Sequence, residues 1–226
     1  MIAAVIFDFD GVLADTERLH FGAFVEVFAA RGWTLDESSY YQRYIGYDDR
    51  GTVRAFAADH GVPLDLADVE AISSAKAGAF ARLVASRDVL YPGAAETVRR
   101  LTPDFRLAIA SGALHGEITA MLAAGGLLDA FPVIVGADDV AESKPSPVPY
   151  LTAAAGLGCA PRECVAVEDS HWGLTSARSA GMRTIALPTT SPVHLLGIAD
   201  RILARLADLT PLIVAGLDPS SGLVIR

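Results

Sequence analysis

Six polar side chains stand at or beyond the ends of apolar runs, and their types suit one kind of chemistry. They are four acids, one hydroxyl and one amine: Asp8, Asp10, Ser111, Lys144, Glu168 and Asp169. Carboxylates without a neighbouring cysteine or histidine favour a hard cation bound through oxygen, and such a site suits Mg²⁺. A lysine and a serine add donors for the oxygens of a phosphoryl group, whose transfer depends mainly on positioning and charge neutralisation. The set therefore indicates phosphoryl transfer.

The segment "FDFDG" (7–11) carries two carboxylates two residues apart. If the backbone stays extended, Asp8 and Asp10 point to the same side. Asp8 can then attack phosphorus and form an aspartyl phosphate, while Asp10 protonates the leaving oxygen and later deprotonates the attacking water. Gly11 lets the chain turn away without a side chain that blocks the approach. A nearby like charge raises the pKa of one carboxyl, which suits a group that acts first as an acid.

Five nearly continuous apolar runs predict strands that are buried on both faces of a parallel sheet. They cover residues 3–9, 106–112, 131–136, 164–169 and 183–188. Helix-like segments between the later runs cover residues 93–102, 114–124, 147–156 and 173–180, as in α/β proteins with right-handed crossovers. Ligands of open parallel sheets bind beyond the carboxyl ends of the strands, so the six polar side chains are expected to converge there.

The connection between the first and second runs is far longer than a single crossover needs. It begins with apolar residues at helical spacing, namely Phe21, Phe24, Val25 and Phe28, and continues with periodic stretches near 37–45, 50–60 and 66–86. We therefore expect a core domain of residues 1–15 and 88–226 and a helical cap domain of residues 16–87. Two short joints, 13–16 and 87–94, connect them and would form a hinge. For the last dozen residues the sequence indicates only a terminal strand or tail.

Composition limits the class of protein. The chain has 226 residues, of which 52% are hydrophobic, so it can bury a substantial core. Its formal net charge of -9 argues against a nucleic-acid partner or an anionic membrane surface. No window is long and apolar enough for a membrane span and no leader pattern is visible, so a cytoplasmic location is expected. Cys159 and Cys164 are expected to be reduced structural thiols.

Four segments, in this order, resemble the motifs of the haloacid dehalogenase superfamily. They are "DFDGVLADTE" (8–17), "ASG" (110–112), "SKPSP" (143–147) and "VEDS" (167–170). The helical insertion after the first motif resembles the subfamily I cap of β-phosphoglucomutases and phosphoglycolate-type phosphatases. The resemblance extends from residue 5 to about 190 and implies a Rossmann-like parallel sheet with an inserted α-helical cap.

The resemblance also implies roles for the motif residues. Ser111 and Lys144 would act with the catalytic pair Asp8 and Asp10. Mg²⁺ would be held by the Asp8 side chain, the Asp10 backbone carbonyl and Asp169, with Glu168 contributing directly or through water. Aspartate at both positions 8 and 10 implies a phosphatase or phosphotransferase rather than a dehalogenase.

Residues expected to bind substrate lie mainly in the cap. The β-phosphoglucomutase-like group has a hinge threonine, a histidine, a loop glycine and a lysine at the positions of Thr16, His20, Gly46 and Lys76. Arg50 in the cap and Gly112 beside Ser111 complete the predicted set.

The chain departs from the mutase pattern at two positions. Asp49 stands where an arginine is usual, and His115 stands where an asparagine is usual. Both lie in loops that would contact the distal phosphate and the hydroxyls of a sugar.

Taken singly, these residues could be turn formers, helix caps or solvated charges, and only the joint pattern favours a site. The leading hypothesis is a Mg²⁺-dependent phosphatase that acts on a small phosphorylated metabolite, either a sugar phosphate or a phosphoglycolate-like compound. The alternative is a β-phosphoglucomutase-like phosphotransferase. A more remote one is a non-catalytic phospho-receiver or binding protein, although receiver domains are shorter and have no cap. The sequence leaves open whether the chain is a monomer or a weak dimer.

Overall fold

The structure is a computed structural model that describes residues 1–45, 47–84 and 89–218. The chain divides into two compact units, one of Met1–Asp15 with Val89–Arg226 and the other of Thr16–Asp88. We refer to them as the core unit and the cap unit. Among the helices of the described residues, none combines the length and apolar composition needed to cross a lipid bilayer.

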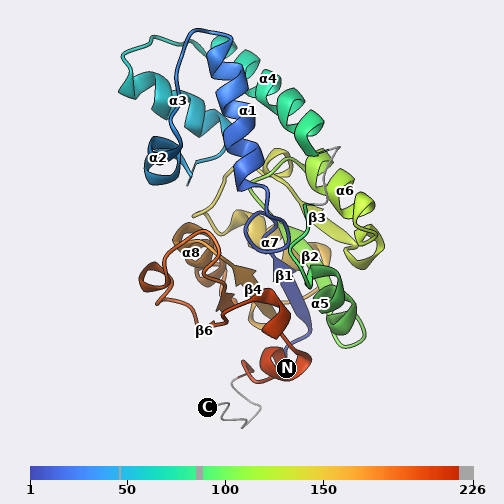
Figure 1. Cartoon of the computed structure of the whole chain (residues 1–226). Coiled ribbons are helices and arrows are strands. Elements are labelled where there is room, and N and C mark those ends of the chain that lie inside the picture. Colours follow the sequence, from blue (N-terminus) through green and yellow to red (C-terminus); the bar gives the residue numbers. More distant parts are fainter. Residues whose placement is uncertain (46, 85–88, 219–226) are drawn as a thin grey trace. The chain divides into compact units, whose positions relative to one another are not determined.

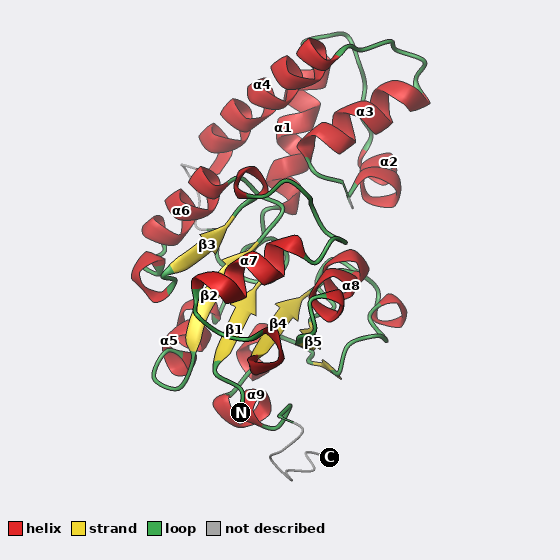
Figure 2. Cartoon of the chain, turned by 180° about the vertical axis from the view of Figure 1, so that it is seen from behind, coloured by secondary structure: helices red, strands yellow, loops and turns green. Residues whose placement is uncertain are grey.

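A six-stranded parallel sheet organises the core unit (Figure 2). Its spatial order is β3-β2-β1-β4-β5-β6, and each neighbouring pair is parallel. The strands are β1 (Ala4–Phe7), β2 (Arg106–Ala110), β3 (Val133–Val135), β4 (Cys164–Glu168), β5 (Arg183–Ala186) and β6 (Arg201–Ile202). All residues of β1 and β4 are buried, which explains their unbroken apolar sequences. The predicted α/β fold is confirmed.

Helices cover both faces of this sheet. They are α5 (Ala94–Leu101), α6 (His115–Ala124), α7 (Val148–Gly156), α8 (His171–Ser179) and α9 (Pro211–Ala215). Figures 1 and 2 show α5 and α7 on opposite faces. Short 3₁₀ turns connect the larger elements: η2 (Leu128–Ala130), η3 (Ala137–Asp139), η4 (Pro161–Glu163), η5 (Val193–Leu195) and η6 (Leu206–Asp208).

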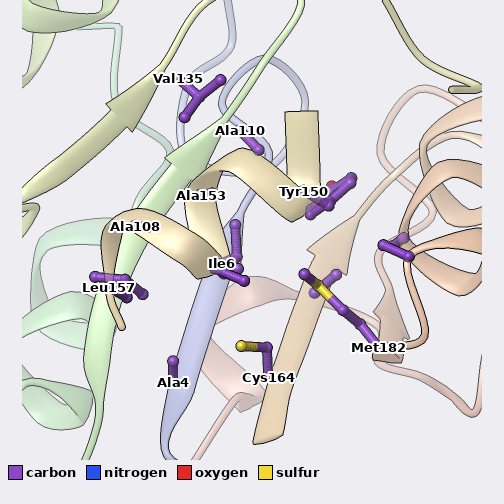
Figure 3. Close-up of a cluster of buried hydrophobic side chains, with 14 residues drawn as sticks. Ala4, Ile6, Ala108, Ala110, Val135, Tyr150, Ala153, Leu157, Cys164 and Met182 are labelled. Carbon is purple, nitrogen blue, oxygen red and sulfur yellow. The ribbon is translucent and has the colours of Figure 1, made fainter. Parts of the chain in front are cut away.

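Small side chains allow α7 and α8 to lie close to the sheet (Figure 3). One buried cluster joins Ala4 and Ile6 of β1, Ala108 of β2 and Ala166 of β4 to Tyr150 of α7. Alternate strand residues enter this cluster because successive side chains of a strand point to opposite faces. Tyr150 is fully buried near the carboxyl ends of the strands, where its hydroxyl contacts the polar site described below.

The cap unit is helical. Its elements are α1 (Glu17–Ala29), α2 (Glu37–Ser39), a π-helical turn η1 (Tyr40–Tyr44), α3 (Asp49–Asp59) and α4 (Leu66–Val84). An aromatic cluster fills its interior, in which Phe28 packs on Phe56 with 4.4 Å between ring centroids and Trp33 contacts both rings. The apolar periodicity of this part of the sequence therefore reflects packing within the unit.

Predicted elements agree with the observed ones to within a few residues, with instructive differences. The helix expected at 173–180 begins at His171, because the Ser170 side chain accepts a hydrogen bond from the Gly173 amide and caps it. The two-residue strand β6 has no apolar run and was not predicted. Both cysteines are free thiols, as expected. Of the C-terminal dozen, residues 219–226 lie outside the described part, and Asp218 pairs with the Met1 ammonium at 3.1 Å.

Candidate active site

The ends of β1 and β4 bring two acids together where the strand order reverses. Phe7 pairs with Val167 in the parallel register, and the Asp8 amide donates to the Val167 carbonyl at 2.9 Å. The next residues on the two strands are Asp8 and Glu168, which are 8% and 0% exposed. The open end of a parallel sheet at such a reversal is where ligands bind in this class of fold.

Lys144 connects these two acids. Its Nζ lies 2.9 Å from Asp8 Oδ1 and 2.6 Å from Glu168 Oε1, and only 13% of its side chain is exposed. The ammonium also lies 5.1 Å from the centre of the Tyr150 ring. Lys144 is followed by a cis peptide bond to Pro145. The two contacts of Nζ hold the ammonium as a positive charge between Asp8 and Glu168.

Both oxygens of Glu168 are occupied by hydrogen-bond donors. The Tyr150 hydroxyl donates to Oε1 at 2.8 Å, in addition to Lys144. The amides of Asp169 and Ser170 and the Ser170 hydroxyl donate to Oε2 at 3.1, 3.3 and 3.0 Å. A Cβ at Gly173 would overlap this carboxylate, so the first turn of α8 needs glycine there.

Asp169 completes the acidic cluster. One carboxylate oxygen from each of Asp8, Glu168 and Asp169 lies within 4.8 Å of the other two. The Thr190 hydroxyl donates to Asp169 Oδ2. A Cβ at Gly11 would overlap the same carboxylate, and Gly11 has a φ of +77°. Glycine is therefore required at position 11 both by the backbone conformation and by the space that Asp169 occupies.

The other core residues of the predicted set lie at the same edge of the sheet. Ser111 is buried after β2, where its amide donates to the Val135 carbonyl at 2.9 Å and its hydroxyl accepts from the Ala113 amide at 3.1 Å. Gly112 borders open space. Asp10 is half-buried and forms a backbone bridge with Ala14 in the turn after β1.

Burial and charge shift the pKa values in this cluster. Burial is the main reason why the pKa of Asp8 rises to about 7, and the charges of Glu168 and Asp10 raise it further against the opposing effect of Lys144. Burial, followed by Glu168 and Asp8, also raises the pKa of Asp169 well above its ordinary value. Burial alone would lower the pKa of Lys144, but Asp8 and Glu168 outweigh it and the pKa is raised.

This cluster fits a divalent cation. Its acids outnumber its one ammonium group, so neighbouring carboxylates repel one another unless protons or a cation compensate. Oxygen is the only donor atom that the three carboxylates offer, and Mg²⁺ is bound through oxygen. Such a cation beside the Lys144 ammonium and the Ser111 hydroxyl would suit an anionic phosphoryl group.

In the cap unit, three predicted residues are neighbours. Lys76 is completely buried, and its Nζ lies 2.6 Å from His20 Nδ1 and 2.6 Å from Asp49 Oδ1. The ammonium also lies over the rings of Phe24 and Phe80, and His20 stacks on Phe80. Thr16 is buried before α1 and its carbonyl accepts from the His20 amide at 2.9 Å.

Arg50 has a different environment from these residues. Its guanidinium binds Glu70 through two contacts of 2.8 and 2.9 Å, and both side chains are more than half exposed. Gly46, the remaining predicted cap residue, lies outside the described residues.

In each unit, the predicted residues have partners that the predicted set does not include. In the sequence Asp49 stands out only as a departure from the mutase pattern, whereas the structure pairs it with Lys76. Tyr150 sits in a helix, and no short-range pattern links it to Glu168. Thr189 and Thr190 directly follow the fifth apolar run, and this position beyond a strand end is the sequence signal that marks them.

Sequence comparison relates the chain to a known family of hydrolases. The sequence model of the family "haloacid dehalogenase-like hydrolase" matches residues 5–187. The protein CbbY of Rhodobacter capsulatus is 39% identical over 199 residues, which cover 83% of this chain and 86% of that protein. The fructose-1-phosphate phosphatase YqaB of Escherichia coli is 31% identical over 185 residues, which cover 81% of this chain and 95% of that protein.

One solved structure is similar to the chain in both fold and sequence. It is a mutant of CbbY from Rhodobacter sphaeroides in complex with xylulose-(1,5)bisphosphate. The two are 34% identical, the TM-score is 0.85, and the alignment covers 92% of this chain and 96% of that one.

Proposed function

The chain belongs to the haloacid dehalogenase-like hydrolases, and we propose that within this family it is a Mg²⁺-dependent sugar-phosphate phosphatase that works through an aspartyl phosphate on Asp8. Family membership supports an enzyme of the phosphatase type over the receiver and binding-protein alternatives. The metal, the intermediate and the substrate class are our inference. The observation that carries it is the contact of Lys144 with Asp8 and Glu168 beside Asp169.

Asp8 is the proposed nucleophile. In the first step a carboxylate oxygen of Asp8 forms a bond to phosphorus while the bond from phosphorus to the substrate oxygen breaks, and Asp10 gives its proton to the leaving alcohol. In the second step water attacks phosphorus, Asp10 takes a proton from that water, and Asp8 is released as a carboxylate with inorganic phosphate. Asp10 thus returns to its starting state after each cycle.

Lys144 and Ser111 would bind the phosphoryl oxygens. Lys144 is anchored by Asp8 and Glu168, and its raised pKa keeps it protonated at neutral pH. Ser111 is buried at the end of β2, with its hydroxyl at the edge of the sheet that carries the acids. Donors that are already in place need no rearrangement during the reaction, and such preorganisation lowers the activation barrier.

Asp8, the Asp10 backbone carbonyl and Asp169 would hold the cation directly. When bound, Mg²⁺ would neutralise charge on the transferred group. Glu168 already accepts donors on both oxygens, and this favours an indirect contribution in which it orients Lys144 and the chain around Asp169.

Substrate recognition is proposed to involve Gly112 in the core unit and Thr16, His20, Gly46, Arg50 and Lys76 in the cap unit. The substrate class rests on two relatives, of which one is named a fructose-1-phosphate phosphatase and the other has been solved with xylulose-(1,5)bisphosphate. The pairing of Lys76 with Asp49 in the cap is compatible with a sugar, because an ammonium can donate to sugar hydroxyls and a carboxylate can accept from them.

Release of inorganic phosphate from a panel of substrates tests the proposal. The panel contains fructose 1-phosphate, xylulose 1,5-bisphosphate, glucose phosphates and phosphoglycolate, each with Mg²⁺ and with EDTA. Asp8→Asn should abolish turnover of every substrate, whereas Asp104→Asn, at an exposed turn, should leave it intact. Turnover by Asp8→Asn at the wild-type rate, or full turnover in EDTA, would refute the mechanism.

A mutase remains the second candidate because His20 and Lys76, two of the four residues that match that group, are in direct contact. In a mutase the aspartyl phosphate passes to a second sugar phosphate instead of water. Conversion of β-glucose 1-phosphate to glucose 6-phosphate, stimulated by the bisphosphate, would decide for it.

A further inference from the structure

Two adjacent threonines after β5 reach the acidic cluster from a part of the chain that the four motifs do not include. The Thr190 hydroxyl donates to Asp169 Oδ2. The Thr189 hydroxyl donates to the Gly11 carbonyl and lies 3.5 Å from the same Asp169 oxygen. The backbone positions them, because the Leu187 amide donates to the Glu168 carbonyl at 2.8 Å and extends the pairing of β4 with β5 up to the site.

Gly11 is held at both of its backbone polar groups. Its amide donates to the Ala14 carbonyl at 2.8 Å, and its carbonyl accepts from Thr189. Because the peptide group is planar and trans, fixing the Gly11 amide also fixes the direction of the Asp10 carbonyl. The turn after β1 and the side chain of Asp169 are thus connected through one pair of hydroxyls.

We propose that Thr189 and Thr190 are positioning residues for the cation site: Thr190 orients the Asp169 carboxylate, and Thr189 fixes the turn that presents the Asp10 carbonyl. This inference rests on the proposed Mg²⁺-dependent function. The hydrogen bond from Thr190 to Oδ2 restricts rotation of the Asp169 carboxylate, and so fixes the direction in which its oxygens can meet a cation. Outer partners of this kind commonly change metal affinity by about 10–100-fold when they are removed.

Crowding explains why such partners are needed. Asp169 shares its surroundings with Asp8 and Glu168, and like charges at this separation push carboxylates apart unless hydrogen bonds or a cation hold them. A carboxylate that is already oriented loses less conformational freedom when a metal binds. The short distance that a Cβ at Gly11 would have to Asp169 also shows that the carboxylate lies directly against the turn.

The test is Mg²⁺ affinity measured by titration calorimetry on the full chain without substrate. Thr190→Val keeps the shape of the side chain and removes the donor, and it should weaken Mg²⁺ binding on the order of 10-fold or more. Thr190→Ser restores the hydroxyl and should bind Mg²⁺ within a few-fold of the wild type. In assays of phosphate release, Thr190→Val should need more Mg²⁺ for half-maximal rate, while the KM for substrate at saturating Mg²⁺ changes little.

The chain offers a matched control in β5, the strand that precedes the two threonines. Thr184 is fully buried, and its hydroxyl donates to Asp200 Oδ2 at 3.0 Å. Thr184→Val therefore also removes a threonine–aspartate hydrogen bond, but between residues that lie outside the acidic cluster. It should lower the melting temperature and leave the Mg²⁺ dissociation constant unchanged.

Two results would overturn the inference. One is a folded Thr190→Val variant that binds Mg²⁺ like the wild type. The other is an equal loss of affinity in Thr184→Val, because general destabilisation would then explain both. If Thr190→Val does not fold, the comparison of Thr190→Ala with Thr190→Ser decides in the same way. A wild-type chain that binds no Mg²⁺ would instead refute the proposed function, so the two failures are distinguishable.

Discussion

Replacing Lys144 by methionine should show how much the Lys144 ammonium stabilises the buried acids of the site. Methionine has a similar length and no charge. In the wild type the ammonium lies 2.9 Å from Asp8 and 2.6 Å from Glu168. The variant would leave these buried carboxylates without a counter-charge, and removing one partner of a buried ion pair typically destabilises a protein by about 3–5 kcal/mol.

This loss can be converted into a melting temperature. For a domain of this size, 1 kcal/mol corresponds to about 2–4 °C, so Lys144→Met in EDTA should melt roughly 6–20 °C below the wild type at about pH 8. At about pH 5 the difference should shrink, because protonation of the acids removes the uncompensated charge. Differential scanning calorimetry at the two pH values measures both effects.

Mg²⁺ provides a second part of the same test. Since a bound cation would compensate Asp8 and Asp169, it should restore much of the lost melting temperature of Lys144→Met without restoring phosphate release, which also needs the ammonium. Arg99→Met, at an exposed position of α5, is the control for loss of a positive charge and should melt like the wild type. Equal melting of Lys144→Met and wild type in EDTA at about pH 8 would refute the electrostatic reasoning.

Three further outcomes follow from the geometry. In the metal-free wild type, the raised Asp8 pKa of about 7 favours the protonated folded state, so stability falls as pH rises from about 4 to 7. Saturating Mg²⁺ should therefore raise the melting temperature more at about pH 8 than at about pH 5.5, and an equal shift would contradict this. Position 11 has a positive φ, and a Cβ there would overlap Asp169, so Gly11→Ala should lower the free energy of unfolding by at least about 1–2 kcal/mol and impair Mg²⁺ binding. Position 32 also has a positive φ but borders open space, so Gly32→Ala should show only the loss of stability, as measured by denaturant unfolding. Burial raises the pKa of Cys164 to about 12, so native alkylation followed by mass spectrometry should modify half-buried Cys159 first, and equal labelling would count against the buried thiol.

Most of the core architecture could be predicted because burial determines the composition of its strands. Strands β1, β2, β4 and β5 lie inside a parallel sheet and have almost uninterrupted apolar sequences. Strand β6 contains two residues at the edge, one of them exposed, and its alignment with β5 depends on backbone hydrogen bonds that leave no trace in residue type. Periodicity could not have found it.

The acids of the site could also be predicted, since each follows a strand and strand ends converge in a parallel sheet. Their partners could be predicted only in part. Lys144 belongs to a recognisable motif, but the hydrogen bond from Tyr150 to Glu168 joins a helix to a strand end 18 residues later, and it requires the packing of α7 on the sheet. No local pattern encodes that contact.

The cap shows a different limit. A sequence pattern identified Lys76 and His20 separately, but a lysine in an amphipathic helix is ordinarily solvated, and its complete burial follows from the aromatic faces of Phe24 and Phe80 that enclose it. Such burial is tolerable only with an acid at hand, and Asp49 supplies it at 2.6 Å. Asp49 is thus best understood as the counter-charge of Lys76 inside the cap. A substitution of Asp49 by arginine, as in the mutase pattern, would leave two positive charges facing each other unless an anionic group of the ligand replaced the carboxylate. The difference at this one position therefore bears directly on whether the ligand brings a second negative charge to the cap.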